Sequence, residues 1–241
     1  MPPVVPPLSP RLAALACAIA AGSRVADIGS DHGLLPLWLA ASGRAAYGLA
    51  VERTEELLAG VARPPAGVSW AERLDYRAGD GLRAIRTEDR IDTIVLAGLG
   101  GRTIVQLLGA PETASPDLRR LVIQPRSEPS LVRRWLRDHG WRLATERLTE
   151  QCDRVHLTVA AERGADAGLY DHETLSREDL LAAGPLLVRS PSAEMGRAWR
   201  KERDRLASIV EGSGSGPSIE RARSGLGRAL RVLAAISPPG E

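Results

Sequence analysis

A chain of 241 residues, 44% of them hydrophobic, is long enough for one full α/β domain and a smaller second unit. Aromatic residues make up 3% and there is no Phe, so Leu, Val, Ile and Ala must form the core. The formal net charge of +2 excludes binding to nucleic acid through overall charge, so any basic surface must be local. The two cysteines, Cys17 and Cys152, match no metal spacing, which predicts a reducing compartment and no metal site.

The first predicted element is a short amphipathic helix. Ser9 is a favourable N-cap and Pro10 suits the first helical position, and the apolar stretch continues to a stop near Gly22. The stretch carries one charge, Arg11, and follows a proline-rich start without a basic region, which argues against a signal peptide. No apolar run approaches the roughly 20 residues of a membrane span. We therefore expect a cytoplasmic protein with no membrane association.

Apolar strands alternate with helices over about 150 residues, which predicts a mostly parallel, seven-stranded sheet with helices on both faces. A proline at position 125 is expected to close the fifth strand. The expected strands are residues 24–28, 45–51, one within 68–77, 91–97 and 119–124, and a final pair, 142–150 and 154–161. The expected helices are residues 34–41, 54–62, 103–108 and 128–139.

The pattern changes after the last strand, so we expect two domains, residues 1–163 and 164–241. Two helical stretches with apolar seams flank a glycine- and serine-rich turn at 212–217, which predicts an antiparallel, coiled-coil-like helical hairpin. The first seam contains Met195, Trp199, Leu206 and Ile209, and the second contains Ile219, Ala222, Leu226, Ala229, Leu233 and Ile236.

Polar residues and glycines gather where the predicted strands end. They are Asp27 to Gly33, Glu52, Asp80, Gly98 to Gly101, and Gln124. The carboxyl ends of parallel strands meet at one edge of a sheet, and ligands of such folds bind in the crevice there. The turn after the first strand, Gly29-Ser30-Asp31-His32-Gly33, is the most informative of these segments because it leads into the N-terminus of a helix.

This turn departs from the Gly-x-Gly-x-x-Gly dinucleotide pattern, because Asp31 replaces the second glycine. A carboxylate there would repel a pyrophosphate, which disfavours a dinucleotide and favours S-adenosylmethionine. Glu52 could accept the ribose hydroxyls, Asp80 the adenine amino group, and Asp27 could hold the amino-acid end. The plainer alternatives are that Asp27 caps the turn, that Glu52 is a helix-start acid and that Gly98 to Gly101 serve close packing.

The turn after the fourth strand bears on the reaction. Ala97-Gly98-Leu99-Gly100-Gly101 stands where enzymes that methylate an exocyclic amine commonly carry Asn/Asp-Pro-Pro-aromatic. Neither cysteine lies near the crevice, which disfavours a covalent mechanism at pyrimidine C5. The glycines leave room for a planar group beside a methyl donor.

Over nearly its whole length the chain resembles the bacterial tRNA (adenine-22-N1)-methyltransferase family. The motifs that carry the resemblance are Leu8-Ser9-x-Arg11-Leu12, Ala26-Asp27-Ile28-Gly29-Ser30-Asp31-His32-x-x-Leu35-Pro36, Gly79-Asp80-Gly81-Leu82, Ala97-Gly98-Leu99-Gly100-Gly101, Leu121-x-Ile123-Gln124-Pro125, Arg134-Trp135-Leu136 and Gly184-Pro185, with the terminal helix pair. The resemblance implies a Rossmann-like class I methyltransferase domain with a helical hairpin domain, S-adenosyl-L-methionine as cofactor and N1 of an adenine in tRNA as acceptor.

The resemblance also implies roles for individual residues. Asp31 is the expected catalytic residue, whose carboxylate would position the base and stabilise the developing charge; the alternative is that it only binds the cofactor's ammonium group. The expected cofactor-binding residues are Asp27, Gly29, Ser30, His32, Gly33, Glu52, Asp80, Gly81, Ala97 and Gly98. The sequence departs from the family at Leu99, where Met is usual, and at Arg126, where Asn is usual. An arginine favours phosphate over a base edge, so the target nucleotide stays open at this point.

The expected tRNA surface is a cluster of arginines around the fifth strand, together with the hairpin. The cluster comprises Arg119, Arg120, Arg126, Arg133, Arg134 and Arg137. The alternative is that these are separate solvated arginines. His32 could stack on a flipped adenine or only hydrogen-bond at the helix start.

Two other functions remain open: a methyltransferase for another RNA or a small molecule, and a non-catalytic protein that binds the cofactor or RNA. We expect a monomer.

Overall fold

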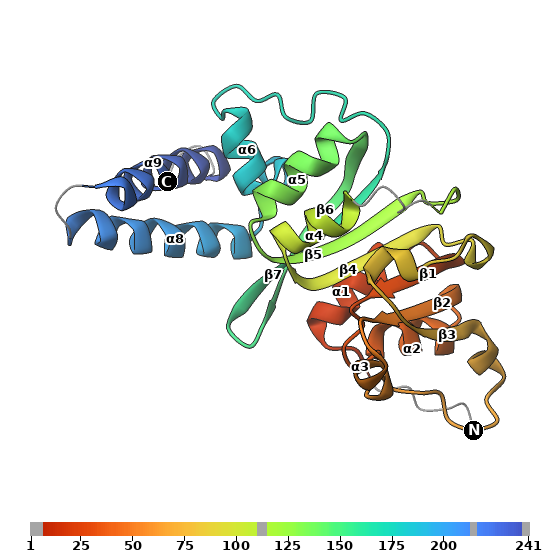
Figure 1. Cartoon of the computed structure of the whole chain (residues 1–241). Coiled ribbons are helices and arrows are strands. Elements are labelled where there is room, and N and C mark those ends of the chain that lie inside the picture. The colour runs from red at the N-terminus through yellow and green to blue at the C-terminus, as the bar shows by residue number, and fades with distance from the viewer. Residues whose placement is uncertain (1–6, 110–114, 213–215, 238–241) are drawn as a thin grey trace. The chain divides into compact units, whose positions relative to one another are not determined.

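The computed structural model describes residues 7–109, 115–212 and 216–237 (Figure 1). The chain forms two compact units, Met1–Ala165 and Asp166–Glu241. The first unit contains the sheet, and the second contains helices.

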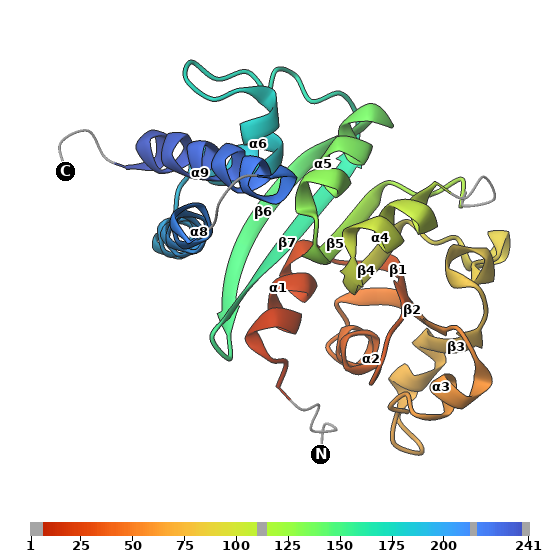
Figure 2. The same cartoon turned by 60° about the vertical axis from the view of Figure 1, so that its left-hand side comes forward.

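The first unit is built on a seven-stranded sheet in the order β3-β2-β1-β4-β5-β7-β6. The first five strands are mutually parallel, whereas β7 runs antiparallel to β5 and β6 antiparallel to β7. This arrangement confirms the mostly parallel sheet that the alternating pattern predicts, and Figure 2 shows β6 and β7 as its long final hairpin. The strands are β1 (Ser23–Ile28), β2 (Ala45–Glu52), β3 (Leu74–Ala78), β4 (Thr93–Gly100), β5 (Arg120–Ser127), β6 (Trp141–Gln151) and β7 (Arg154–Arg163).

Helices cover both faces of the sheet. Successive side chains of a strand point to opposite faces, and in β5 the neighbours Leu121, Val122 and Ile123 are all fully buried. Helices α1 and α2 pack on Val122 in one core cluster, and α4 and α5 contact each other and β5. The helices of this unit are α1 (Pro10–Ala18), α2 (Leu34–Ala41), α3 (Glu55–Ala59), α4 (Gly101–Leu108) and α5 (Pro129–Asp138), with 3₁₀ turns η1 (Ser69–Arg73), η2 (Gly81–Ala84) and η3 (Thr87–Asp89).

Helix α1 begins as the sequence predicts and ends earlier. Ser9 is its N-cap, with the hydroxyl accepting a hydrogen bond from the Leu12 amide, and Pro10 is its first residue. It ends at Ala18 instead of near Gly22. The guanidinium of Arg44 donates to the carbonyls of Ala16 and Ile19, which satisfies carbonyls that a longer helix would use.

The fifth strand does not stop at Pro125, as the sequence suggested, but continues to Ser127. Pro125 lies opposite Leu99, at a shift in the register between β4 and β5. An irregular register of this kind is where a strand accommodates a proline, which has no N–H to donate to the ladder. Two other expected elements are shorter than predicted: α3 ends at Ala59, and the third strand is confined to Leu74–Ala78 after a 3₁₀ turn.

The second unit contains the predicted helical hairpin, formed by α8 (Ala193–Glu211) and α9 (Pro217–Ile236). Met195 and Leu206 are buried on α8, and Ala222 and Ala229 on α9. On the second seam Val232 is buried instead of the expected Leu233. Two short helices that the sequence did not reveal precede the hairpin, α6 (Arg177–Ala183) and α7 (Pro185–Arg189).

Asp179 joins α6 to α9 within this unit. Its side chain is 2% exposed and forms a capping box with Ser176 at the start of α6. It also accepts hydrogen bonds from Arg231, at 2.8 and 3.0 Å, and from Arg228 at 3.3 Å. The Arg231 hydrogen bonds are the largest cause that lowers the pKa of Asp179 to about 2. A fixed ion pair therefore holds this carboxyl in its charged form.

Among the helices of the described ranges, none has the length and apolar character needed to cross a membrane.

Candidate active site

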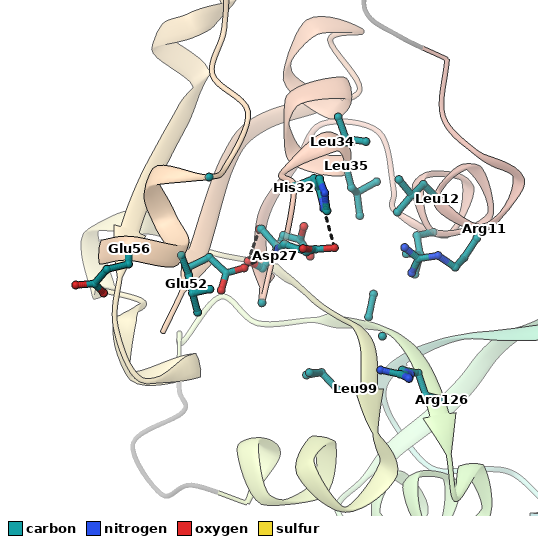
Figure 3. Close-up of a pocket in the computed structure, with 18 residues that line it drawn as sticks. Arg11, Leu12, Asp27, His32, Leu34, Leu35, Glu52, Glu56, Leu99 and Arg126 are labelled. Carbon is teal, nitrogen blue, oxygen red and sulfur yellow. Dashed lines mark hydrogen bonds and ion pairs between the residues drawn. The ribbon is translucent and has the colours of Figure 1, made fainter. Parts of the chain in front are cut away.

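A cavity of about 640 Å³ opens at the carboxyl edge of the sheet, where β1, β2 and β4 end. Figure 3 shows Glu52 and Glu56 on one side of it, Arg11 and Arg126 on the other, and Asp27 at its centre. Most of the residues that the sequence assigns to cofactor binding and catalysis line this cavity. They are Asp27, Gly29, Ser30, Asp31, His32, Glu52, Ala97 and Gly98.

Two glycines shape the floor of the cavity. Gly29 and Gly98 have φ angles of +71° and +74°, which side chains rarely adopt. A Cβ built on either residue meets no protein atom within 4 Å, so each glycine borders open space. The backbone of the turns after β1 and β4 is therefore accessible to a ligand in the cavity.

Asp31 combines an unusual backbone with an exposed side chain. Its φ of 55° lies in the left-handed region, which costs a non-glycine residue conformational energy. Its amide donates to Oε1 of the buried Glu52 at 2.5 Å, and this bond holds the turn in place. The carboxylate is 80% exposed and pairs with Nδ1 of His32 at 2.9 Å. The fold thus fixes the main chain of Asp31 and leaves its carboxylate accessible.

In contrast to the exposed side chain of Asp31, Asp27 is buried, at 4% exposed. Burial is the largest cause that raises its pKa to about 7, and the charge of Glu52 adds to the rise. The hydrogen bond of Ser30 and the charge of Arg11 act in the other direction and lower the pKa. This carboxyl therefore changes its protonation state near neutral pH.

Three residues predicted to bind the cofactor, Gly33, Asp80 and Gly81, do not line this cavity. A Cβ on Gly33 would meet Cγ1 of Val61 at 2.3 Å, and one on Gly81 would meet Cδ2 of Leu107 at 2.5 Å, so close packing accounts for both glycines. Asp80 borders a separate cavity of about 300 Å³, where its carboxylate lies 3.2 Å from the guanidinium of Arg83.

The structure adds residues that sequence reasoning did not assign to the site. Arg11 and Leu12 reach the cavity from α1, and Leu57 reaches it from α3. Arg11 is the one charge in an apolar helix, a signal that could have indicated a role for it. Gln124, which the sequence placed at the ligand edge, is 2% exposed and accepts a hydrogen bond from Nη1 of Arg11 at 2.9 Å. It does not line the cavity and instead holds α1 against the sheet.

The six arginines do not form one patch. Arg120 begins β5 and Arg126 follows near its end, about 20 Å away at the usual rise per residue. Arg119 and Arg120 border a different cavity, and the Arg120 guanidinium pairs with Glu162. Arg133 is 1% exposed and its guanidinium lies 2.6 Å from Glu146, so it faces the protein interior. Within the described residues Arg126 is the member of the cluster that lines the site.

No group of three or more His, Cys, Asp or Glu side chains in the described ranges has an arrangement that could hold a metal ion.

The comparisons with known proteins agree with this geometry. The methyltransferase domain family matches residues 8–158. The tRNA (adenine(22)-N(1))-methyltransferase of Bacillus subtilis (strain 168) is 31% identical over 204 residues, which cover 85% of this chain and 84% of that protein. The crystal structure of the B. subtilis m1A22 tRNA methyltransferase is 27% identical, with a TM-score of 0.82 over 96% of this chain and 99% of the other.

A Streptococcus pneumoniae protein solved in complex with S-adenosyl-L-methionine is 26% identical, with a TM-score of 0.80 over 94% of this chain and all of the other. The family match over more than half of the chain and the identity to the B. subtilis enzyme together establish the relationship. This chain belongs to the tRNA (adenine(22)-N(1))-methyltransferase family of methyltransferase-domain proteins.

Proposed function

We propose that this protein transfers a methyl group from S-adenosyl-L-methionine to N1 of adenine 22 in tRNA. The observation that carries the proposal is the 31% identity to the B. subtilis enzyme over 85% of this chain. In addition, the acidic turn after β1 lines a cavity. Because a fold alone does not determine function, the roles in the reaction are assigned to named residues of the cavity.

The residues of the cavity fit the proposed cofactor. S-adenosyl-L-methionine carries an ammonium group, a sulfonium and two ribose hydroxyls, all of which carboxylates can bind. Glu52, buried at the end of β2, is the proposed acceptor for the ribose hydroxyls, and Asp27 the proposed partner of the ammonium group. The open space over Gly29 and Gly98 leaves room for the cofactor against the main chain. When bound, the cofactor supplies an electrophilic methyl group.

Asp31 is the proposed catalytic residue. Adenine N1 carries an in-plane lone pair and is mostly neutral at pH 7, so attack on a methyl group needs no strong base. The N1–methyl bond would form as the bond between the methyl group and the sulfonium sulfur breaks, so that a neutral thioether leaves and the adenine ring becomes cationic. A carboxylate beside N1 and the N6 amino group holds the base and stabilises that charge. The carboxylate of Asp31 is exposed at the cavity, as this role requires, and His32 beside it is a candidate stacking partner for the base.

Arg126 is the proposed contact for a tRNA phosphate. It is exposed, lines the cavity, and its guanidinium has no hydrogen bond or ion pair with another described residue. Arginine recognises phosphate through paired N–H donors.

The hairpin of α8 and α9 is a second candidate contact for tRNA. Deletion of residues 166–241 should then weaken tRNA binding more than cofactor binding. A tRNA substrate also supports the cytoplasmic location expected from the sequence, and the monomeric state stays a prediction.

The test is methylation of total tRNA from cells that lack the protein, with labelled S-adenosyl-L-methionine and nucleoside mass spectrometry. The expected product is 1-methyladenosine, and a tRNA transcript with guanine at position 22 should accept no methyl group. Ribosomal RNA serves as a parallel substrate. Absence of 1-methyladenosine in tRNA would overturn the proposal, and methylation of ribosomal RNA alone would replace the substrate.

A further inference from the structure

A second cavity, of about 810 Å³, lies at the edge of the sheet where the parallel strands begin. Ser23 begins β1 and Arg120 begins β5, and both line this amino-edge cavity, as does Thr93 at the start of β4. The candidate active site opens at the opposite edge, so the length of the strands separates the two cavities. The proposed methyl transfer assigns no role to the amino-edge cavity, although its volume is within the usual range of small-molecule sites.

The residues that line the amino-edge cavity carry an excess of positive charge. Five arginines and three acids line it, an excess of two positive charges. The arginines are Arg24, Arg90, Arg119, Arg120 and Arg163, and the acids are Asp92, Asp117 and Glu162. A concave surface lined mainly by one sign of charge attracts ligands of the opposite sign, so the cavity favours an anion.

Three of the five arginines have no carboxylate partner. Arg90 pairs with Asp117 at 3.2 Å, and Arg120 pairs with Glu162. Within the described residues no carboxylate pairs with the guanidinium groups of Arg24, Arg119 and Arg163. Their charges therefore remain available to a ligand.

Two of these three guanidinium groups are held in place without being neutralised. The guanidinium carbon of Arg24 lies 4.3 Å from the centre of the Tyr47 ring, and that of Arg163 lies 4.0 Å from the Trp141 ring. An aromatic face orients a guanidinium but carries no net charge. Arg119 is exposed, and its guanidinium has no hydrogen bond within the described residues. The cavity thus combines two oriented cations with one that can move onto a ligand.

We propose that the amino-edge cavity is a second ligand site, which binds a small molecule through a diphosphate group. A guanidinium donates two parallel N–H bonds to phosphate oxygens, and two linked phosphates present enough oxygens to engage several arginines together. The volume leaves room for a nucleoside attached to the diphosphate. A small ligand is favoured over RNA because these arginines line one cavity, whereas an RNA backbone is followed by cations spread along a groove.

The experiment is calorimetric titration of the full chain with inorganic pyrophosphate, in the absence of cofactor and tRNA. We expect Arg119→Gln to weaken pyrophosphate binding by about tenfold, and Arg119→Gln combined with Arg163→Gln by about 100-fold, the usual losses for one and two charged hydrogen-bond partners. Titration with GDP distinguishes the two sources of a diphosphate. Tighter binding of GDP than of pyrophosphate indicates a nucleoside diphosphate, and equal or weaker binding indicates a free diphosphate.

Two control variants separate this site from general charge and from the candidate active site. Arg142 pairs with Glu162, as Arg120 does, but does not line the amino-edge cavity, so Arg142→Gln removes a positive charge beside the cavity and none from its lining. Arg126 lines the candidate active site, so Arg126→Gln reports pyrophosphate that binds there. Both variants should keep the wild-type affinity for pyrophosphate.

Absence of pyrophosphate binding by the wild type at millimolar concentration would overturn the inference. Losses in Arg142→Gln or Arg126→Gln equal to the loss in Arg119→Gln would overturn it as well. Displacement of pyrophosphate by tRNA, with weaker tRNA binding by Arg119→Gln, would show that the cavity is an RNA contact instead. The proposed function fails separately, because a protein that binds pyrophosphate at this cavity and methylates no tRNA supports the second site and contradicts the tRNA reaction.

Discussion

Asp27 in the sheet unit and Asp179 in the helical unit are almost equally buried, at 4% and 2% exposed, yet their acidities differ widely. The pKa of Asp27 is raised to about 7, and that of Asp179 is lowered to about 2. Asp179 accepts hydrogen bonds from two arginines of α9. The nearby cation of Asp27, Arg11, is hydrogen-bonded to Gln124 instead. Equal exposure of the side chains therefore does not give equal pKa values: burial is the largest cause at Asp27, whereas the hydrogen bonds from Arg231 are the largest cause at Asp179.

Two other acids with buried side chains in the sheet unit also have an arginine partner. Asp89 pairs with Arg77 at 2.6 Å, and Glu146 pairs with Arg133 at 2.6 Å. Removing one partner from such a pair leaves a buried charge unsatisfied and destabilises the fold. Within the described residues, Asp27, Asp31 and Glu52 at the cavity have no arginine partner of this kind, which fits their proposed roles in binding the charges of a ligand. The comparison predicts that substitutions in the cavity reduce function, and that substitutions of the paired acids reduce stability.

The largest expected effect is on methyl transfer. Asp31→Ala should slow the reaction with tRNA by about 100- to 1,000-fold, the usual loss when a group that stabilises transition-state charge is removed. Cofactor affinity, measured by calorimetry, should change little. Asp153→Ala is the control, because Asp153 is also exposed and left-handed (φ 57°) but does not line the cavity. Loss of cofactor binding in Asp31→Ala would show that Asp31 only holds the cofactor.

The second largest expected effect is on cofactor affinity when Asp27 is replaced. Asp27→Asn should weaken cofactor binding by about 10- to 100-fold, because it removes the proposed charged partner of the ammonium group. Wild-type affinity should fall as the pH drops below about 7, where Asp27 takes up its proton. Affinity that is independent of pH between 5.5 and 8.5 would contradict this role.

The same group makes stability depend on pH without cofactor. The pKa of Asp27 is higher in the folded chain than in the unfolded one, so the free energy of unfolding should fall as the pH rises from about 4 to about 7. Asp27→Asn should be more stable than the wild type at pH 8, by about 1 kcal/mol or more. Thermal unfolding at pH 5 and pH 8 measures the pH dependence of the wild type and the effect of Asp27→Asn. If Asp27→Asn is less stable than the wild type at pH 8, buried Asp27 does not destabilise the folded chain.

Asp179 should behave in the opposite way. Its pKa is lowered in the folded chain, so its contribution is present above about pH 4 and is lost as the pH falls toward 2. Asp179→Asn should destabilise the protein by about 1–2 kcal/mol at pH 7, a value reduced for solvent screening because Arg231 is half exposed. Urea unfolding measures the change. Asp204→Asn, in an exposed pair with Arg203, should have almost no effect.

The smallest expected effect is on tRNA affinity. Arg126→Gln should weaken tRNA binding by about three- to tenfold and reduce the salt dependence by about one phosphate contact, with cofactor binding unchanged. Arg119→Gln, at the opposite end of β5, serves as the control. Equal losses in both variants would indicate a diffuse basic surface in place of a contact at the cavity.

The sequence predicted the sheet and most of the residues that line the cavity, because both depend on local patterns. Apolar runs located the seven strands, and the glycines and acids at their ends located Asp27, Asp31 and Glu52. Long-range packing decided the rest. Nothing local to Arg11 shows that α1 returns to the cavity, since Gln124 and Gln151, which hold it, are more than 100 residues away. The burial of Arg133 likewise depends on Glu146, which lies on another element.

The left-handed backbone of Asp31 has an evolutionary consequence. A glycine adopts this conformation without strain, and aspartate and glycine codons differ by a single base. Selection for stability alone would therefore favour replacement of this aspartate, and a single point mutation would suffice. A strained aspartate in a turn that glycine would relax fits the proposed role of Asp31, in which activity is obtained at the expense of stability.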